Sequence, residues 1–369
     1  MRKLSVQREE FVDPYQDEFR KKYGVWTDLA SEAHQVIVDR EGPPELPGVI
    51  VKNEETEYAL ISRVTVENEI GAKMIGKAPG HYCTIEAPVL RQHNREIQQE
   101  IGALLAKEIK WFLAEANLAD EDTVLVVGLG NWNATPDALG PKVIDNLMVT
   151  RHLIELSPPE LRHGLRPVAA LAPGVLGLTG IETGEIIRGT VQEVGAKAVI
   201  CVDALASRSV ERLCSTIQIS DTGINPGSGV GNKRMAINQE TLGIPVIAIG
   251  VPTVVHAATI VSDALGYLEG RDPGQAQRAK DIPQRTQFNL DPQTIISGQP
   301  EKFSAQPPMT EQQKMQMIAK VLQPYMGSMI VTPKEIDELI DDVTQVIAGG
   351  LNAAFHEGVD YSEIFQYLS

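Results

Sequence analysis

Four short runs of Val, Ile and other aliphatic residues constrain this chain more than any other feature of its sequence. None of them alternates between apolar and polar residues, and helical patterns separate them; they occupy residues 123–127, 167–171, 198–202 and 245–249. Such strands are covered on both faces, because a strand with one face in water alternates between apolar and polar residues. Strand, helix and strand in succession predict a mostly parallel sheet between helical layers. We expect an α/β fold, an α/β/α sandwich, with its sheet core at about 122–265.

The segments before and after this core have other patterns. Short β-branched runs between Gly and Pro in residues 40–90 predict a small N-terminal antiparallel substructure. Residues 92–117 have the spacing of an amphipathic helix. Pro141 is expected to open one helix in the core, because proline is favoured in the first helical turn. The apolar face of that helix would carry Val143, Leu147 and Ile154.

The C-terminal part divides into a polar segment and helices. Residues 270–309 are rich in Pro, Gln and charge and predict a long surface excursion. C-terminal helices are expected over about 310–357. A capping box that starts the last helix is predicted from Thr332, Pro333 and Glu335. Its apolar stripe, predicted to be structural and to run as far as Gly349-Gly350, comprises Ile336, Leu339, Val343 and Ile347.

Composition excludes several classes of function. There are 33 basic and 49 acidic residues, for a formal net charge of -16, so the chain is a poor partner for nucleic acid. Its three cysteines form no C-x-x-C pair and cannot build a disulfide framework. The first thirty residues lack the apolar run of a secretory signal, and Pro245 and Pro252 interrupt the most apolar stretch. We therefore expect a soluble protein of a reducing compartment.

Two carboxylates follow strands of the predicted sheet. Parallel sheets bind ligands beyond the carboxyl ends of their strands, where Asp203 directly follows one run and Asp137 lies in the loop after another. Alone, Asp203 has an ordinary explanation as a helix cap and Asp137 as a turn residue. Together at one sheet edge, two carboxylates can share a proton, activate water and protonate a leaving amine. The pair suggests a hydrolase.

Other chemistries find less support. The glycines that open the loop after Val127 resemble a dinucleotide fingerprint, but Asn133 occupies the third glycine position. No serine elbow surrounds Ser228, and no His-Glu-x-x-His motif is present. Cys201 is expected to be a buried apolar filler. His256 alone would be a packed or solvated histidine, yet with Asp137 and Asp203 it could complete a metal site.

A glycine-rich segment at 221–234 also follows the core strands. It holds four glycines and ends in Lys233 and Arg234. It is either a turn-rich loop or a backbone cradle that admits an extended peptide near the carboxylates.

Long motifs in this chain resemble the spore germination protease family. The likeness covers roughly residues 25–270 and returns in the final helices, and motifs of this length are specific. They are Gly128-Leu-Gly-Asn-Trp-Asn-Ala-Thr-Pro-Asp-Ala-Leu-Gly-Pro141, Thr150-Arg-His152, Ala172-Pro-Gly-Val-Leu-Gly-Leu-Thr-Gly-Ile-Glu-Thr183, Asp203-Ala-Leu-Ala-Ser-Arg208, residues 221–234 and Val331-Thr-Pro-Lys-Glu335.

The resemblance implies an endopeptidase that degrades small acid-soluble spore proteins during germination, cutting after Glu or Asp. It implies a homotetramer in the cytoplasm of the forespore or spore core, made as an inactive zymogen, without a cofactor or metal. The matching motifs carry the family's candidate catalytic aspartates, which are grouped with those of aspartic peptidases, onto Asp137 and Asp203. The fold implied is similar to that of hydrogenase maturation peptidases. Substrate-contacting candidates are Asn131, Asn133, Arg208, Lys233 and Arg234.

Thr27-Asp-Leu-Ala-Ser-Glu32 resembles the family's cleavage site. Its residue types alone predict a helix start capped by Thr27 or Asp28. The resemblance implies autoprocessing between Asp28 and Leu29, which divides the chain into a propeptide, 1–28, and a peptidase domain, 29–369. This propeptide is longer than is usual for the family.

Two alternatives stay open. One is a metal-assisted peptidase that uses the same aspartates and His256. The other is a protein that binds spore proteins without cutting them.

Overall fold

The structure, a computed structural model, describes Tyr15 and residues 27–41, 46–156, 158, 164–226, 235–257, 260–261 and 329–357. The chain forms two compact units: Met1–His256 with Ile330–Ser369, and Ala257–Met329. The larger unit holds every element discussed below, and the predicted surface excursion at 270–309 lies outside the described residues. Among the described helices, none is long and apolar enough to cross a membrane.

One sheet runs through the described part of the larger unit. Its strands lie in the order β1-β2-β3-β7-β8-β6-β4-β5, and β9 pairs with β8. β5, β4, β6 and β8 are parallel to one another, while the other pairings are antiparallel. The strands are β1 (Val49–Glu55), β2 (Leu60–Val66), β3 (Gly80–Glu86), β4 (Val124–Gly128), β5 (Val168–Leu171), β6 (Ala198–Ser207), β7 (Thr216–Ser220), β8 (Val246–His256) and β9 (Ile330–Val331).

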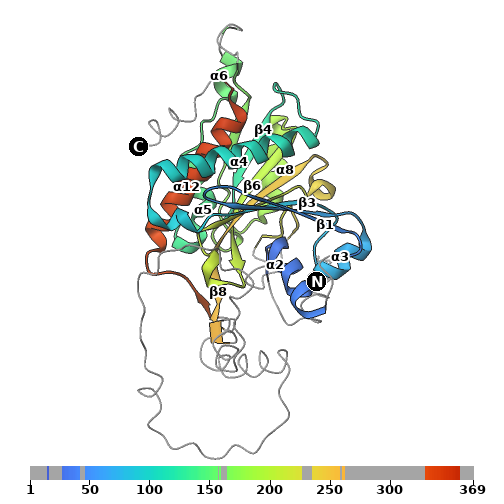
Figure 1. Ribbon diagram of the computed structural model, residues 1–369. Helices are drawn as coiled ribbons and strands as arrows, with labels where there is room; N and C mark the ends of the chain where they lie inside the picture. Colours follow the sequence, from blue (N-terminus) through green and yellow to red (C-terminus); the bar gives the residue numbers. More distant parts are fainter. Residues whose placement is uncertain are drawn as a thin grey trace, which may run out of the picture. The chain divides into compact units, whose positions relative to one another are not determined.

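Helices and short 3-10 turns connect these strands (Figure 1). The helices are α2 (Ala30–Glu41), α3 (Glu69–Ile75), α4 (Arg95–Glu115), α5 (Leu139–Asp145), α6 (Arg151–Leu156), α7 (Leu176–Thr179), α8 (Thr183–Val194), α9 (Gln239–Leu242) and α12 (Ile336–Phe355). The 3-10 turns are η1 (Pro88–Gln92), η2 (Thr135–Asp137) and η4 (Val210–Arg212).

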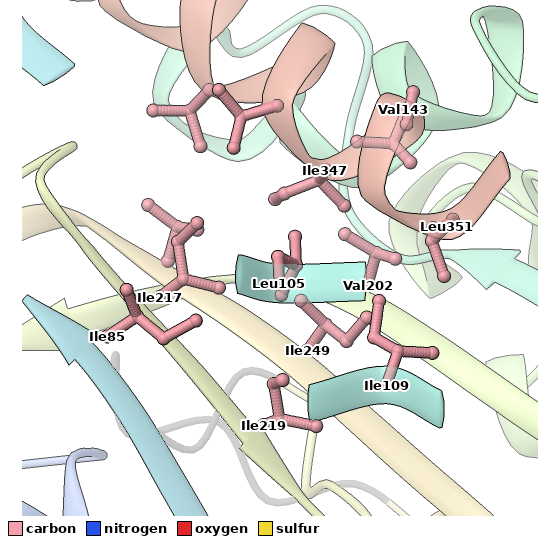
Figure 2. Close-up of a cluster of buried hydrophobic side chains, with 14 of the residues drawn as sticks. Ile85, Leu105, Ile109, Val143, Val202, Ile217, Ile219, Ile249, Ile347 and Leu351 are labelled. Carbon is pink, nitrogen blue, oxygen red and sulfur yellow. The ribbon is translucent and has the colours of Figure 1, made fainter. Parts of the chain in front are cut away.

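The central strands are buried on both faces, as the absence of alternation predicts. Val124 and Val126 of β4 belong to a cluster with α4, α5 and α12, whereas Leu125 and Val127 pack with α8. α4 and α12 cross each other on the first face (Figure 1). Aliphatic side chains from both helices and from β6, β7 and β8 meet there (Figure 2). The α/β sandwich is confirmed.

The antiparallel strands predicted in 40–90 are present, but they do not form a separate substructure. β3 pairs with β7, and β7 pairs with β8, so these strands continue the central sheet. α2 and α3 pack on this half of the sheet in a cluster of their own. Sequence analysis missed β7, because its five residues interrupt the regular strand and helix rhythm.

The predicted helix at Pro141 is instead two short helices. α5 begins at Leu139 and ends at Asp145, and α6 starts again at Arg151. The break is held from α12, where the Asn352 side-chain oxygen accepts a hydrogen bond from the Met148 N–H at 2.9 Å. The helical spacing of the apolar residues thus extends across the turn between α5 and α6, and this is why the sequence predicted one helix.

Both predicted limits of the last helix are wrong. Thr332 donates its hydroxyl to the Thr253 carbonyl at 2.9 Å, and α12 begins at Ile336 without a side-chain cap. The helix also continues past Gly349-Gly350 to Phe355. A Cβ at Gly350 would lie 2.9 Å from Leu105 Cδ2, so this glycine permits close packing on α4. The apolar stripe itself is buried, as predicted.

The edge of the parallel half is stepped. β4 ends at Gly128, opposite Val202, whereas β6 continues beside β8 as far as Ser207. The sequence predicted Asp203 at the end of its strand, and this is wrong. Asp203 lies inside β6, one residue beyond the last pairing of β6 with β4. The chain leaving β4 folds over this step, since the Leu129 N–H donates to the Val202 carbonyl at 2.8 Å.

Gly140→Ala should destabilise this loop. A Cβ at Gly140 would lie 2.2 Å from the Leu129 carbonyl oxygen and 2.5 Å from that of Val202, both backbone atoms that cannot rotate away. We expect the free energy of unfolding, measured by urea denaturation, to fall by about 1–3 kcal/mol. Gly189→Ala on α8 is the control: with no described atom within 4 Å of its Cβ, it should gain ~0.5–1 kcal/mol. Equal effects would contradict this account.

Candidate active site

The loop after β4 carries Asp137 over the step in the sheet. The Asn131 N–H donates to the Asp137 carbonyl at 2.9 Å, and the Thr253 hydroxyl of β8 donates to the Pro136 carbonyl at 2.6 Å. Gly130 has φ +118°, and a Cβ there would lie 2.0 Å from the Asp137 carbonyl oxygen. The glycines of this motif thus serve a tight loop rather than a nucleotide.

Asp203 has a buried carboxyl group beside the step in the sheet. It is 6% exposed, and its carboxylate accepts the Ala204 N–H at 2.9 Å. Burial raises the pKa of Asp203 well above its usual range, and the nearby charges of Asp137 and Asp28 raise it further. Asp137 and Asp203 are therefore brought together, and both line one cavity of about 1060 Å³.

Asp28 lines the same cavity, alongside β6. Its N–H points to the Ala206 carbonyl at 3.4 Å, and its carboxylate accepts the Ala206 N–H at 3.1 Å. Burial raises the pKa of Asp28, while the charge of Lys77 opposes that rise. The residue that precedes the predicted processing point therefore pairs with the strand that carries Asp203.

The peptide group after Asp28 is held by two side chains, one from the chain after α3 and one from β7. The Asp28 carbonyl oxygen accepts Lys77 Nζ at 2.9 Å and Gln218 Nε2 at 3.0 Å. Gln218 Oε1 in turn accepts the Ala30 N–H at 2.7 Å. Sequence analysis missed both residues, because Lys77 follows α3 and Gln218 lies on the unpredicted strand β7.

The other end of the segment is anchored through Glu32. Its buried carboxylate accepts the Ser207 hydroxyl at 3.0 Å and the Arg208 N–H at 3.2 Å, and lies 3.4 Å from Arg212 Nε. The Thr27 hydroxyl also donates to Glu32, and Thr27 Oγ1 accepts the Leu29 N–H at 3.1 Å. α2 starts at Ala30, so a helix does begin here, but the residue before it is Leu29 and not the predicted cap Thr27 or Asp28. The segment 27–32 is thus fixed on both sides of the Asp28–Leu29 bond.

Of the remaining predicted residues, those that the structure describes do not line this cavity. Asn131 and Asn133 shape the loop, where the Asn133 N–H donates to Asn131 Oδ1 at 3.0 Å. Arg208 contributes its backbone N–H to Glu32. Lys233 and Arg234 lie outside the described residues. The described start of their loop, 221–225, lines the cavity.

The histidine and cysteine candidates are also placed. His256 ends β8, opposite Ile330 of β9, and its charge acts to lower the pKa of Asp28. Across the described part of the chain, no three His, Cys, Asp or Glu side chains gather as a metal-binding group, so Asp137, Asp203 and His256 do not form such a set. Cys201 is fully buried, as predicted, and burial raises the pKa of its thiol.

The cavity therefore combines several carboxyl groups with a stretch of the chain's own polypeptide along an α/β sheet. The sequence profile of the germination protease family matches residues 28–368. The germination protease of Bacillus thuringiensis subsp. konkukian is 45% identical over 362 residues, which is 94% of this chain and 97% of the relative. That of Bacillus mycoides is 46% identical over the same shares of both chains. The chain belongs to the germination protease family and is a peptidase.

Asp203→Asn should stabilise the fold increasingly as the pH rises. Because the pKa of Asp203 is raised in the folded chain, the unfolded chain releases this proton first, and the wild type loses stability as pH rises towards the folded pKa. Asn does not titrate. In calorimetry, the Tm of the variant minus that of the wild type should be smallest near pH 4 and grow towards neutral pH. Exposed Asp145→Asn should show a flat difference; a shrinking difference for Asp203→Asn would contradict the assignment.

Proposed function

We propose that this chain is the zymogen of a germination endopeptidase that degrades small acid-soluble spore proteins, and that Asp137 and Asp203 activate the attacking water. The observation that carries the proposal is that Asp28, the residue before the processing point, lines the same cavity as both aspartates. The substrates would be cut after Glu or Asp in stretches that resemble residues 27–32. Membership of the family supports the germination role.

The proton balance of the pair supports an aspartic-type reaction. Asp203 holds a proton at pH values where an exposed aspartate has lost it. Asp137 would take a proton from water as the water oxygen attacks the peptide carbon. The C–N bond then breaks, and Asp203 gives its proton to the leaving amine. One carboxyl group and one amine are formed, and transfer of the proton from Asp137 to Asp203 restores the pair.

Processing would use the same chemistry on the chain itself. Removal of residues 1–28 leaves a mature peptidase of residues 29–369 with Leu29 as its first residue. The family profile begins at residue 28, next to this point. A homotetramer in the spore core, acting without a cofactor, completes the proposal by analogy with the family. A metal-assisted reaction with His256 and a binding protein without activity are the outcomes to be tested against it.

Asp137→Asn and Asp203→Asn should each abolish cleavage while the chain stays folded. Each change keeps the side-chain volume but removes one proton-transfer group, and general acid–base catalysis contributes on the order of 10²–10⁴-fold. The measurement is mass spectrometry of a small acid-soluble spore protein incubated with residues 29–369 of each variant. Asp145→Asn, which changes an exposed aspartate on α5, is the matched control and should cleave at the wild-type rate.

The same assay separates the alternatives. Cleavage by the wild type that resists a chelator favours the two-aspartate reaction, whereas cleavage lost with the chelator would bring a metal and His256 into the site. Intact substrate after long incubation would favour a binding protein. Full activity of either Asn variant would remove that aspartate from the reaction.

The rate should also fall as the pH rises from weakly acidic values. The pair works with one shared proton, and it loses that proton once the pH exceeds the raised pKa of Asp203. We expect kcat/KM for a peptide that contains Thr-Glu-Phe-Ala-Ser-Glu to decline on the alkaline side. A rate that climbs steadily into the alkaline range would point to a different proton donor.

A further inference from the structure

Two buried side chains converge on the Asp28 carbonyl oxygen. It accepts two hydrogen bonds, one from the ammonium group of Lys77 and one from the amide of Gln218. These donors come from different elements, Lys77 from just after α3 and Gln218 from β7. Both side chains are buried, with exposed fractions of 6% and 8%. The oxygen between them belongs to the bond that processing would break.

We propose that Lys77 and Gln218 form the oxyanion-stabilising pair of this peptidase. The inference rests on the proposed function and adds two catalytic residues to its aspartates. As water attacks, the electron pair of the C=O bond moves onto this oxygen, and donors already aimed at it stabilise the charge without reorganising. The positive charge of Lys77 gives a stronger hydrogen bond to the anion than to the neutral carbonyl.

The orientation of the Gln218 amide follows from its two hydrogen bonds. Its Oε1 accepts the Ala30 N–H at 2.7 Å, so Oε1 must face Ala30 and Nε2 must face the Asp28 carbonyl. One side chain therefore holds the backbone on both sides of the Asp28–Leu29 bond. That bridge keeps the carbonyl oxygen in place while the bond beside it is attacked.

The sheet register places Gln218 and Asp203 on one face. Asp203 of β6 pairs with Gly250 of β8, and Gly250 pairs with Gln218 of β7. Residues directly opposite one another project from the same side of a sheet, and two strand spacings amount to about 10 Å. Asp203 and Gln218 thus lie on either side of Gly250, which also lines the cavity.

Lys77 is held in position by the chain around it. Gly76 ends α3 with φ +65°, a left-handed conformation that favours glycine and turns the chain sharply at Lys77. Lys77 Nζ also donates to the Thr27 carbonyl at 3.1 Å, so it bridges the carbonyl groups of Thr27 and Asp28. A buried ammonium needs such acceptors, and here the processing segment supplies them.

The step balances with the aspartates in their proposed roles. The water oxygen bonds to the Asp28 carbon, Asp137 takes its proton, and the carbonyl oxygen becomes negative between Lys77 and Gln218. The oxyanion then reforms the C=O bond, the C–N bond breaks, and the Leu29 nitrogen takes the proton of Asp203. Lys77 and Gln218 transfer no proton and are unchanged at the end.

The first test follows self-processing of the full 369-residue chain by intact-mass spectrometry. Lys77→Met removes one donor, and Gln218→Glu replaces the Nε2 donor by an oxygen while keeping the acceptor for Ala30. Each should lower the first-order rate by about 10²–10³-fold, the loss typical of one oxyanion donor. Lys73→Met, an exposed lysine of α3, is the matched control and should process at the wild-type rate. Rates for Lys77→Met and Gln218→Glu within threefold of the wild type would overturn the proposal.

A second measurement separates catalysis from docking. In an Asp203→Asn background, which should prevent cleavage, hydrogen exchange of the segment 27–32 reports whether it stays bound. Protection that survives Lys77→Met, together with the lost rate, supports an oxyanion role. Protection lost with Lys77→Met would make Lys77 a positioning residue and overturn its assignment. A wild-type chain that cuts neither itself nor a spore-protein substrate would overturn the proposed function. Variants that process as fast as an active wild type would overturn only the roles of Lys77 and Gln218.

Discussion

The extended pairing of β6 with β8 beyond the end of β4 supports everything else in the cleft. It carries Asp203 past the edge where β4 stops, and the vacated step receives the loop that ends in Asp137. Because β8 also pairs with β7 on its other side, the same ladder places Gln218 in register with Asp203. The cleft is thus a consequence of unequal strand lengths, and glycines such as Gly140 let the loop close on the step.

The carboxyl groups of the cleft lower the stability of the fold. Burial of Asp203 beside Asp137 and Asp28 disfavours ionisation, so the fold is less stable at neutral pH than a neutral side chain there would make it. Such strain is common where a site is arranged for catalysis rather than stability. The apolar clusters on both faces of the sheet, with α4 and α12 on one and α8 on the other, offset it.

Much of the architecture could be predicted from local pattern. The uninterrupted apolar runs identified β4, β5 and the first halves of β6 and β8, because burial on both faces leaves no polar alternation. Patterns failed where a distant contact decided the outcome. Thr332 bonds to β8 instead of capping α12, Gly350 packs against α4 instead of ending the helix, and β7 exists because β3 and β8 flank it.

The sequence by itself determined the fold class, and it predicted the two aspartates and the processing motif, since each lies in a contiguous run whose pattern or family likeness is specific. Only the tertiary structure decided that Asp28 lines one cavity with Asp137 and Asp203, and that Lys77 and Gln218 donate to the Asp28 carbonyl oxygen. Those hydrogen bonds join residues 49 and 190 positions apart. Their geometry depends on strand register and on how far each strand extends, which hydrogen bonding between distant segments sets and no local pattern records.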